Sequence, residues 1–305
     1  MNLSSAHTGF FDGDYRVGAI YRSQWQSVPV KYNTFSVNVE KVIKPRDFIK
    51  DKFGLGIILN NDRAGDASYG YTQAYLTGSY HKASFKDSTI AAGVGLGVGW
   101  CNVGFDVTKM TFDNQFDGLA FSKGISSGEK FSWTSRNFLD LNVGGIIRKN
   151  FGSKDRVTYS LGVFHLTRPN VSFQGDESSN LDIRFTNYIS YVHGIKPNTD
   201  VIVEALYNQQ GKNFEMIPHV SLRYYFDKSE NKAVLGGLCF RTRDAVIARL
   251  GYTHKTLQAG ISYDINISSF TPATNRRGGF EIFVNYIIKL EPSFIARKRP
   301  CPVYL

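Results

Sequence analysis

The chain has 305 residues, of which 42% are hydrophobic and 14% aromatic; 29 are glycine, and the formal net charge is +10. A disordered chain would contain fewer aromatic side chains, and a coiled coil would be richer in Ala, Leu and Glu, so the composition excludes both. A helical membrane protein needs apolar segments of about 20 residues. The longest uncharged run, residues 88–105, alternates glycine with bulky apolar residues from Gly93 to Trp100. This alternation indicates a strand, because a helix would scatter the glycines around its circumference.

Period-two alternation recurs along the chain and predicts strands. In the first such run, Tyr15, Val17 and Ala19 alternate with Arg16 and Gly18. Later runs also place apolar or aromatic residues on one face and Gly, Ser, Thr, Asn or Arg on the other. In chain order, we predict fourteen strands near residues 14–25, 30–40, 52–61, 70–82, 87–103, 137–149, 155–166, 183–193, 199–209, 212–226, 233–241, 244–253, 255–265 and 277–290.

The predicted connections differ in length between the two rims of such a sheet. One rim has short turns and one longer basic connection, at 83–86, 150–154, 194–198, 227–232, residue 254 and 41–51. The other rim has the smaller loop 62–69 and the long loops 104–136, 167–182 and 266–276. An even number of antiparallel strands, with short turns at one rim and long loops at the other, is typical of an outer-membrane barrel.

The sequence therefore predicts one all-β domain over residues 1–305, a transmembrane β-barrel of about fourteen antiparallel strands. We expect short periplasmic turns, longer extracellular loops and a short periplasmic C-terminal tail at 291–305, in the outer membrane of a Gram-negative bacterium. Met1 is followed by neither a basic nor an apolar segment. No signal peptide is visible, so we expect the numbering to begin after a removed segment.

The sequence shows no pattern of a catalytic, metal or cofactor site. Its six histidines form no metal-ligand spacing, and its three cysteines form no CxxC pair, so we expect no metal, no cofactor and no enzyme. Lys and Arg are spread over turns, rims and polar faces rather than gathered on one helix. This distribution argues against nucleic acid as a partner and agrees with lipopolysaccharide phosphates or an acidic polypeptide.

Two local groups of residues stand out. The first runs from Gly13-Asp14-Tyr15-Arg16 to Tyr21-Arg22-Ser23-Gln24-Trp25, and the second is Asn60-Asn61-Asp62-Arg63-Ala64-Gly65. We expect Arg16 and Arg22 to point into the lumen, Tyr21 to face lipid and Trp25 to lie at the outer interface. In the second group, we expect Asp62 to cap a tight turn and Gly65 to adopt a positive φ.

These groups carry a resemblance to a known family. The opening residues 1–9 and the two groups above are similar to motifs of the PorP/SprF family of type IX secretion and gliding proteins, although Leu3 replaces a proline of the family pattern. The motifs lie in the first 70 residues, and the rest of the chain matches in strand rhythm and length. The resemblance implies an outer-membrane barrel of Bacteroidota that works with type IX secretion components.

The resemblance also implies a partner. Family members are associated with export or surface retention of large secreted proteins, including gliding adhesins, that carry a C-terminal targeting domain. Some pair with a periplasmic OmpA-like, peptidoglycan-binding protein, and no catalysis is implied. We predict that the secreted protein binds at Arg16, Arg22, Gln24, Trp25, Asp62, Arg63, Phe112, Phe116, Trp133 and Phe173. We predict that a periplasmic partner binds at Lys44, Arg46, Arg297, Lys298 and Arg299.

Two alternatives stay open from the sequence. A fourteen-stranded barrel can serve as a diffusion channel or hydrophobic-solute transporter, which conductance of the purified barrel would reveal. A barrel enzyme such as a lipase would need a Ser/His pair at one strand rim, and His165 or His219 would be the first candidates.

Overall fold

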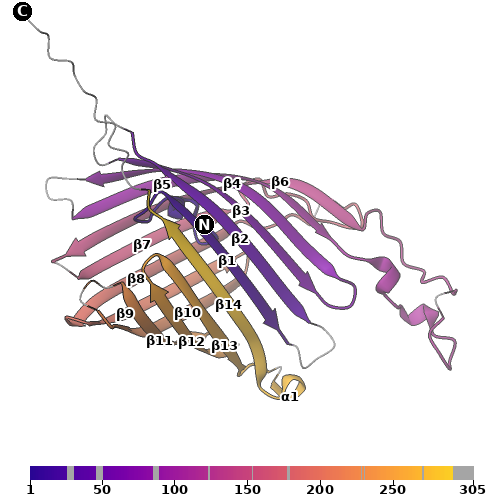
Figure 1. The fold of residues 1–305 in the computed structure, drawn as a ribbon. Coiled ribbons are helices and arrows are strands. Elements are labelled where there is room, and N and C mark those ends of the chain that lie inside the picture. Colours follow the sequence, from indigo (N-terminus) through magenta and orange to yellow (C-terminus); the bar gives the residue numbers. More distant parts are fainter. Residues whose placement is uncertain are drawn as a thin grey trace, which may run out of the picture.

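The computed structural model describes residues 1–25, 31–45, 51–84, 89–122, 124–152, 154–176, 179–227, 229, 231–269 and 271–290. Within these residues, fourteen antiparallel strands form one closed barrel (Figure 1). The strands are β1 Tyr15–Gln24, β2 Tyr32–Ile43, β3 Lys52–Ala64, β4 Tyr69–Ser84, β5 Ile90–Gly104, β6 Ser135–Phe151, β7 Asp155–Phe164, β8 Arg184–Lys196, β9 Thr199–Gln210, β10 Asn213–Tyr225, β11 Lys232–Arg241, β12 Ala245–His254, β13 Leu257–Asn266 and β14 Arg277–Ile288. Four short helices are η1 Ser5–His7, η2 Val107–Lys109, η3 Asp113–Gln115 and α1 Thr271–Thr274.

Every strand pairs with its neighbours in the chain, and the first strand closes the barrel against the last. Strand β1 pairs with β14 without a break from Tyr15↔Ile288 to Gln24↔Gly279. The predicted fold class is therefore confirmed, and each predicted strand corresponds to one strand of the barrel. The basic connection is shorter than predicted, because β2 continues to Ile43 and pairs with β3 there. No helix in the described part of the chain is long and apolar enough to cross a membrane.

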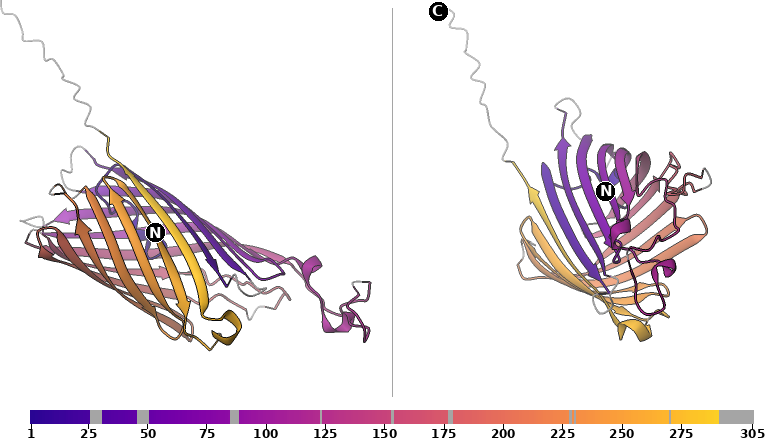
Figure 2. Two further views of the ribbon diagram at one scale, coloured as in Figure 1. Left: turned by 60° about the horizontal axis from the view of Figure 1, so that its bottom comes forward. Right: turned by 90° about the vertical axis from the view of Figure 1, so that its right-hand side faces the viewer.

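The two rims differ as expected. The long-loop rim carries the connections at 105–134, 165–183 and 267–276, and the opposite, short-turn rim carries connections such as 152–154, 197–198 and 255–256. Figure 1 and the left view of Figure 2 show the segment between β5 and β6 projecting far beyond the long-loop rim. Since outer-membrane barrels carry their longer loops outside the cell, we assign the long-loop rim as extracellular and the short-turn rim as periplasmic.

The barrel wall is apolar outside and polar inside, the reverse of a soluble domain. On β3, Phe53, Leu55, Ile57 and Leu59 are 42–54% exposed on the outer surface. The buried side chains point inward and are mostly polar or charged; they include Glu40, Asp140, Thr186 and Ser221. The low mean hydropathy of −0.24 follows from this alternation, because only one face of each strand meets lipid.

The N-terminal residues 1–9, hereafter the N-terminal segment, lie inside the barrel (Figures 1 and 2). Ser4, Ala6 and Thr8 are fully buried. The Ser4 hydroxyl donates to the Leu161 carbonyl of β7 at 2.9 Å, and the Thr8 hydroxyl donates to Thr77 of β4 at 2.8 Å. The segment therefore spans the lumen side of the wall from β4 to β7.

Further contacts tie the end of the segment to the wall. The Ser79 hydroxyl donates to the Thr8 carbonyl at 2.6 Å, where the His81 ring also bonds at 2.8 Å. The backbone N–H of Gly9 donates to the Glu40 carboxylate at 2.9 Å. These bonds satisfy buried polar groups of an irregular segment, which would otherwise destabilise the fold.

Glycines of the wall make room for this segment. A Cβ atom added to Gly54 or Gly95 would overlap the backbone of Thr8 or of Ser5 and Ala6, respectively. A Cβ on Gly144 would meet the Ser4 hydroxyl, and on Gly162 the Leu3 carbonyl. These four glycines therefore form a smooth part of the inner face on which the N-terminal segment rests.

We predict that Gly95→Val displaces the N-terminal segment and destabilises the barrel by about 1–3 kcal/mol, the usual cost of overpacking. Gly78→Val is the matched control, since a Cβ there meets only Leu55 Cδ2, at 4.0 Å. Unfolding in urea from detergent micelles gives the stability, and alkylation of a cysteine placed at Ser5 reports displacement. Equal alkylation and stability in both variants would show that the glycines are not needed for docking.

Candidate functional site

The predicted lumen arginines of β1 are both held by carboxylates. Arg16 donates from Nε and Nη2 to the two oxygens of Glu40 at 2.8 and 2.9 Å, and the Glu40 side chain is fully buried. Arg22 reaches Asp264 of β13 at 2.6 Å. The predicted lumen orientation of both side chains is confirmed. Because their charges are already paired inside the wall, their predicted contact with a secreted protein stays a prediction.

The end of β1 lies at the extracellular rim. Tyr21 is 45% exposed on the outer surface, as predicted. Gln24 is the last residue of β1 and packs close to Gly279 of β14. Trp25 follows it with a positive φ of 55°, and its backbone N–H donates to the Gly278 carbonyl at 2.9 Å. Both residues therefore belong to the seam between the first and last strands.

The turn predicted from Asn60 to Gly65 is partly wrong. Strand β3 continues to Ala64, so Asp62 lies within the strand, where it accepts a hydrogen bond from the Thr34 hydroxyl at 2.6 Å. It does not cap the turn. Arg63 points to the opposite face and is exposed. Gly65 has the predicted positive φ, of 69°. Asp62 does not occupy the predicted turn position because the turn begins only after β3 has paired with β4 as far as Ala64.

Aromatic residues from two extracellular loops gather at the long-loop rim. Phe105 packs against Phe131 and Phe173, with ring centroids 5.1 and 4.8 Å apart, and Phe112 lies 6.4 Å from Phe131. The backbone N–H of Trp133 donates to the Phe173 carbonyl at 3.1 Å. The loops 105–134 and 165–183 are thereby joined. The structure brings together Phe112, Trp133 and Phe173 of the predicted set, with Phe105 as an additional member at the centre.

Beyond this aromatic base, residues 115–122 form a small hairpin. Phe116 and Phe121 pair as an isolated bridge with ring centroids 5.1 Å apart. The Asp117 carboxylate accepts from the backbone N–H groups of Leu119 and Ala120, both at 2.8 Å, and so holds the turn. Leu119 at the tip is 94% exposed. The hairpin therefore presents three large apolar side chains, Phe116, Leu119 and Phe121, to the extracellular side.

Among the histidines of the lumen, His165 and His219 each bond to a carboxylate in a buried polar network. The first centres on Asp140 of β6, which is fully buried and accepts from the hydroxyl of Tyr75. His165 Nδ1 lies 2.8 Å from the same carboxylate. This network joins β4, β6 and the start of the loop after β7, and it contains no Ser/His pair.

The second network does contain a Ser/His pair. His219 Nε2 lies 2.5 Å from the Ser221 hydroxyl, and His219 Nδ1 lies 2.6 Å from Glu204, which also accepts from Tyr188. The three groups have the order of a serine hydrolase triad. However, Ser221 is only 1% exposed, and its strand pairs on both sides, with β9 and β11. Backbone N–H groups that pair in such ladders are not free to stabilise an oxyanion.

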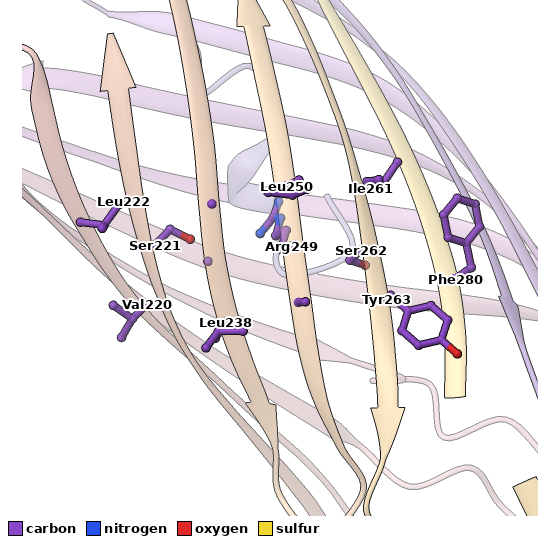
Figure 3. Close-up of a pocket in the computed structure, with 13 residues that line it drawn as sticks. Val220, Ser221, Leu222, Leu238, Arg249, Leu250, Ile261, Ser262, Tyr263 and Phe280 are labelled. Carbon is purple, nitrogen blue, oxygen red and sulfur yellow. The ribbon is translucent and has the colours of Figure 1, made fainter. Parts of the chain in front are cut away.

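An apolar groove of about 630 Å³ lies on the outer wall across β10 to β14. Figure 3 shows its residues on these neighbouring strands. Gly236 and Ala248 are the small residues that leave the hollow between Leu222, Leu238 and Leu250. The groove therefore faces the lipid rather than the lumen.

Most of the predicted periplasmic contacts lie outside the residues that the structure describes. These are Arg46 and, in the tail 291–305, Arg297, Lys298 and Arg299. Lys44 is described, and its Nζ lies 3.2 Å from Asp14 on the surface. Its contact with a periplasmic partner stays a prediction.

A family model described as type IX secretion system membrane protein PorP/SprF matches residues 6–286. The chain belongs to the PorP/SprF family. The family and the closed barrel together place the protein in the outer membrane. No curated protein matches the chain significantly.

Several solved structures share the fold of this PorP/SprF barrel. The Ralstonia pickettii toluene transporter TbuX has a TM-score of 0.58 and 9% identity, covering 94% of this chain and 92% of its own. A Pseudomonas aeruginosa FadL homologue has a TM-score of 0.52 and 10% identity, covering 93% and 92%. The toluene transporter TodX of P. putida has a TM-score of 0.51 and 8% identity, covering 92% and 91%. At these identities the likeness shows the fold alone.

The lumen networks of this PorP/SprF protein cannot be recognised from the sequence alone. His219 and Ser221 are two residues apart on one strand, so period two alone places them on one face. Their partner Glu204 is on the neighbouring strand, and only the register of β9 against β10 brings it opposite His219. The register between β9 and β10 follows from the closed barrel and cannot be recognised from a local sequence motif.

We propose that the Glu204–His219–Ser221 network stabilises the wall and does not catalyse. The purified barrel should hydrolyse p-nitrophenyl butyrate no faster than its Ser221→Ala variant. His219→Ala should lower the free energy of unfolding by about 1–3 kcal/mol, because it leaves buried partners unsatisfied. Ser262→Ala, also a lumen serine of the wall, is the control. Hydrolysis by the wild type that is lost in Ser221→Ala alone would instead identify an enzyme.

Proposed function

We propose that this outer-membrane protein binds a large secreted protein at its extracellular rim, through that protein's C-terminal targeting domain, and helps to export it or retain it at the cell surface. Membership of the type IX secretion family supports a role beside the secretion machinery. The observation that carries the proposal is the hairpin 115–122, whose three apolar side chains project from an ordered aromatic base.

Local hydrogen bonds hold this hairpin in a conformation that leaves its apolar side chains exposed. Asp117 fixes the turn with two hydrogen bonds, and the backbone N–H of Ser122 donates to the Gln115 carbonyl at 2.8 Å. Folded proteins rarely leave such apolar groups together in water unless they contact a partner or a membrane. The segment between β5 and β6, which contains the hairpin, projects away from the barrel (Figure 1), where a polypeptide leaving the cell can reach it.

The aromatic base explains how the hairpin could hold a partner firmly. Phe105, Phe131 and Phe173 pack edge to face, and the Arg136 guanidinium lies over the Trp133 ring at 4.4 Å from its centroid. A base ordered before binding reduces the entropy lost on association. Aromatic and arginine side chains in this arrangement are the residue types that contribute most to protein interfaces.

The variant Phe116→Ser/Leu119→Ser/Phe121→Ser tests this proposal without removing the loop. It should reduce capture of the secreted protein's C-terminal domain by about tenfold or more, because the anchoring apolar area is lost. Co-purification from cells and surface retention of the secreted protein are the measurements. Phe226→Ser, an exposed aromatic at the opposite rim, is the matched control.

The barrel itself should be intact in both variants, which a heat-dependent shift in detergent gels verifies. Surface retention at the wild-type level in the triple variant, with a folded barrel, would contradict the proposal.

A second candidate function is transport of a hydrophobic solute, which the groove of about 630 Å³ on the lipid face favours. An open diffusion channel is less compatible with the N-terminal segment, which is bonded to the wall inside the lumen.

We expect the purified barrel to show no large steady conductance in a planar bilayer, and a variant lacking residues 2–9 to show an increase in conductance. A large steady pore in the wild type would favour transport over partner binding.

A further inference from the structure

The periplasmic mouth of the lumen holds a small recess that none of the functions above uses. Its volume is about 190 Å³. One side is formed by the residues that follow the N-terminal segment, and the other by the wall from β3 to β6. The lining residues are Gly9, Phe10, Phe11, Asp12, Lys52, His81, Ala91, Arg148 and Asn150.

Arg148 of β6 is held in place while most of its donors stay free. Its guanidinium lies over the Phe10 ring, 4.4 Å from the centroid, and its Nε donates to the Thr158 hydroxyl at 3.1 Å. Phe10 packs in turn against the His81 ring, with centroids 5.1 Å apart. Among the described residues, no carboxylate pairs with Arg148. The two terminal amino groups of the guanidinium are therefore available in a side chain that is already oriented.

The surroundings leave the recess with excess positive charge. Lys52 of β3 also lines it and forms no ion pair within 4 Å among the residues that the structure describes, although its charge acts on Asp12 from further away. Asp12 is the acidic residue of the lining, and Lys289 binds it at 2.6 Å. Arg156 of β7 lies on the same inner face, diagonally beside Arg148, because their strands pair as Arg148↔Thr158 and Asn150↔Arg156.

Several arginines of the lumen bind a carboxylate, whereas Arg184 and Arg249, like Arg148, lie over a phenyl ring and form no ion pair among the described residues. Arg16 binds a carboxylate of the neighbouring strand β2, Arg22 binds one of β13, two strands away, and Arg223 binds Asp200 of the neighbouring strand β9 at 2.7 Å. A half-buried cation without a counter-charge is costly. Arg148, which is packed on the Phe10 ring, and Lys52 thus place two positive charges beside an empty volume of the size of a small anionic group.

We propose that this recess binds an oxyanion, a carboxylate or a phosphate group, whose oxygens accept hydrogen bonds from the Arg148 guanidinium and the Lys52 ammonium. A guanidinium fork matches the two oxygens of either group. The recess opens at the short-turn rim, so the group comes from the periplasmic side, either as a free anion or as part of a larger molecule. This site is independent of partner binding at the extracellular rim.

The test uses the purified, full-length barrel in zwitterionic detergent at constant ionic strength. Saturable broadening of the ³¹P signal of inorganic phosphate and of the ¹³C signal of labelled acetate measures binding of each anion and distinguishes the two groups. We expect saturable binding of at least one. Arg148→Gln and Lys52→Gln should each weaken it by about tenfold, as expected for loss of one charge-assisted bond.

Matched variants separate the site from net charge and from folding. Lys212→Gln removes one positive charge at an extracellular turn and should bind the anion as the wild type does. Arg148→Lys keeps the charge but loses the fork, so its affinity should fall between those of the wild type and Arg148→Gln. Absence of saturable binding in the wild type, or equal affinity in folded Arg148→Gln and Lys212→Gln, would overturn the proposal.

Discussion

The structure depends on one constraint, which is that every backbone polar group of a lipid-embedded chain must find a partner within the protein. Water is not available in the hydrocarbon layer, so an open sheet edge would be very costly there. The continuous pairing of β1 with β14 removes that edge. Once the sheet is closed, alternate residues are divided between lipid and lumen. The inner face can then carry carboxylates, histidines and arginines, because they satisfy one another there.

This division explains why so much of the fold was predictable from the sequence. Period two survives in every strand, since each has one lipid face, and turns interrupt it at regular intervals. The lumen positions of Arg16 and Arg22 followed from the same alternation. Asp62 was misassigned because a motif that resembles a turn lay inside a strand whose end is set by pairing with β4.

What fills the lumen could not be predicted in this way. The alternating glycines from Gly93 to Gly99 predict a strand face without side chains, but the sequence does not show which residues pack against that face. In the structure, His81 packs against Gly93, the N-terminal segment against Gly95, Asn142 against Gly97 and Tyr75 against Gly99. These neighbours come from three different parts of the chain, namely the N-terminal segment, β4 and β6. Likewise, Lys52, Phe10 and Arg148 are unremarkable in sequence and meet only because the barrel closes around the N-terminal segment.

The docking of the N-terminal segment also orders the events of assembly. Ser4 bonds to the carbonyl of Leu161, 157 residues later in the chain, and Thr8 bonds to Thr77. Contacts of such sequence separation form late, because the loop must close before they contribute. Residues 1–9 are therefore among the last to become ordered. Until β7 has joined the sheet, the Ser4 contact cannot form, and only Glu40 of β2 and Thr77 of β4 hold the segment. Docking of the N-terminal segment is therefore complete only once β2, β4 and β7 all belong to the same sheet.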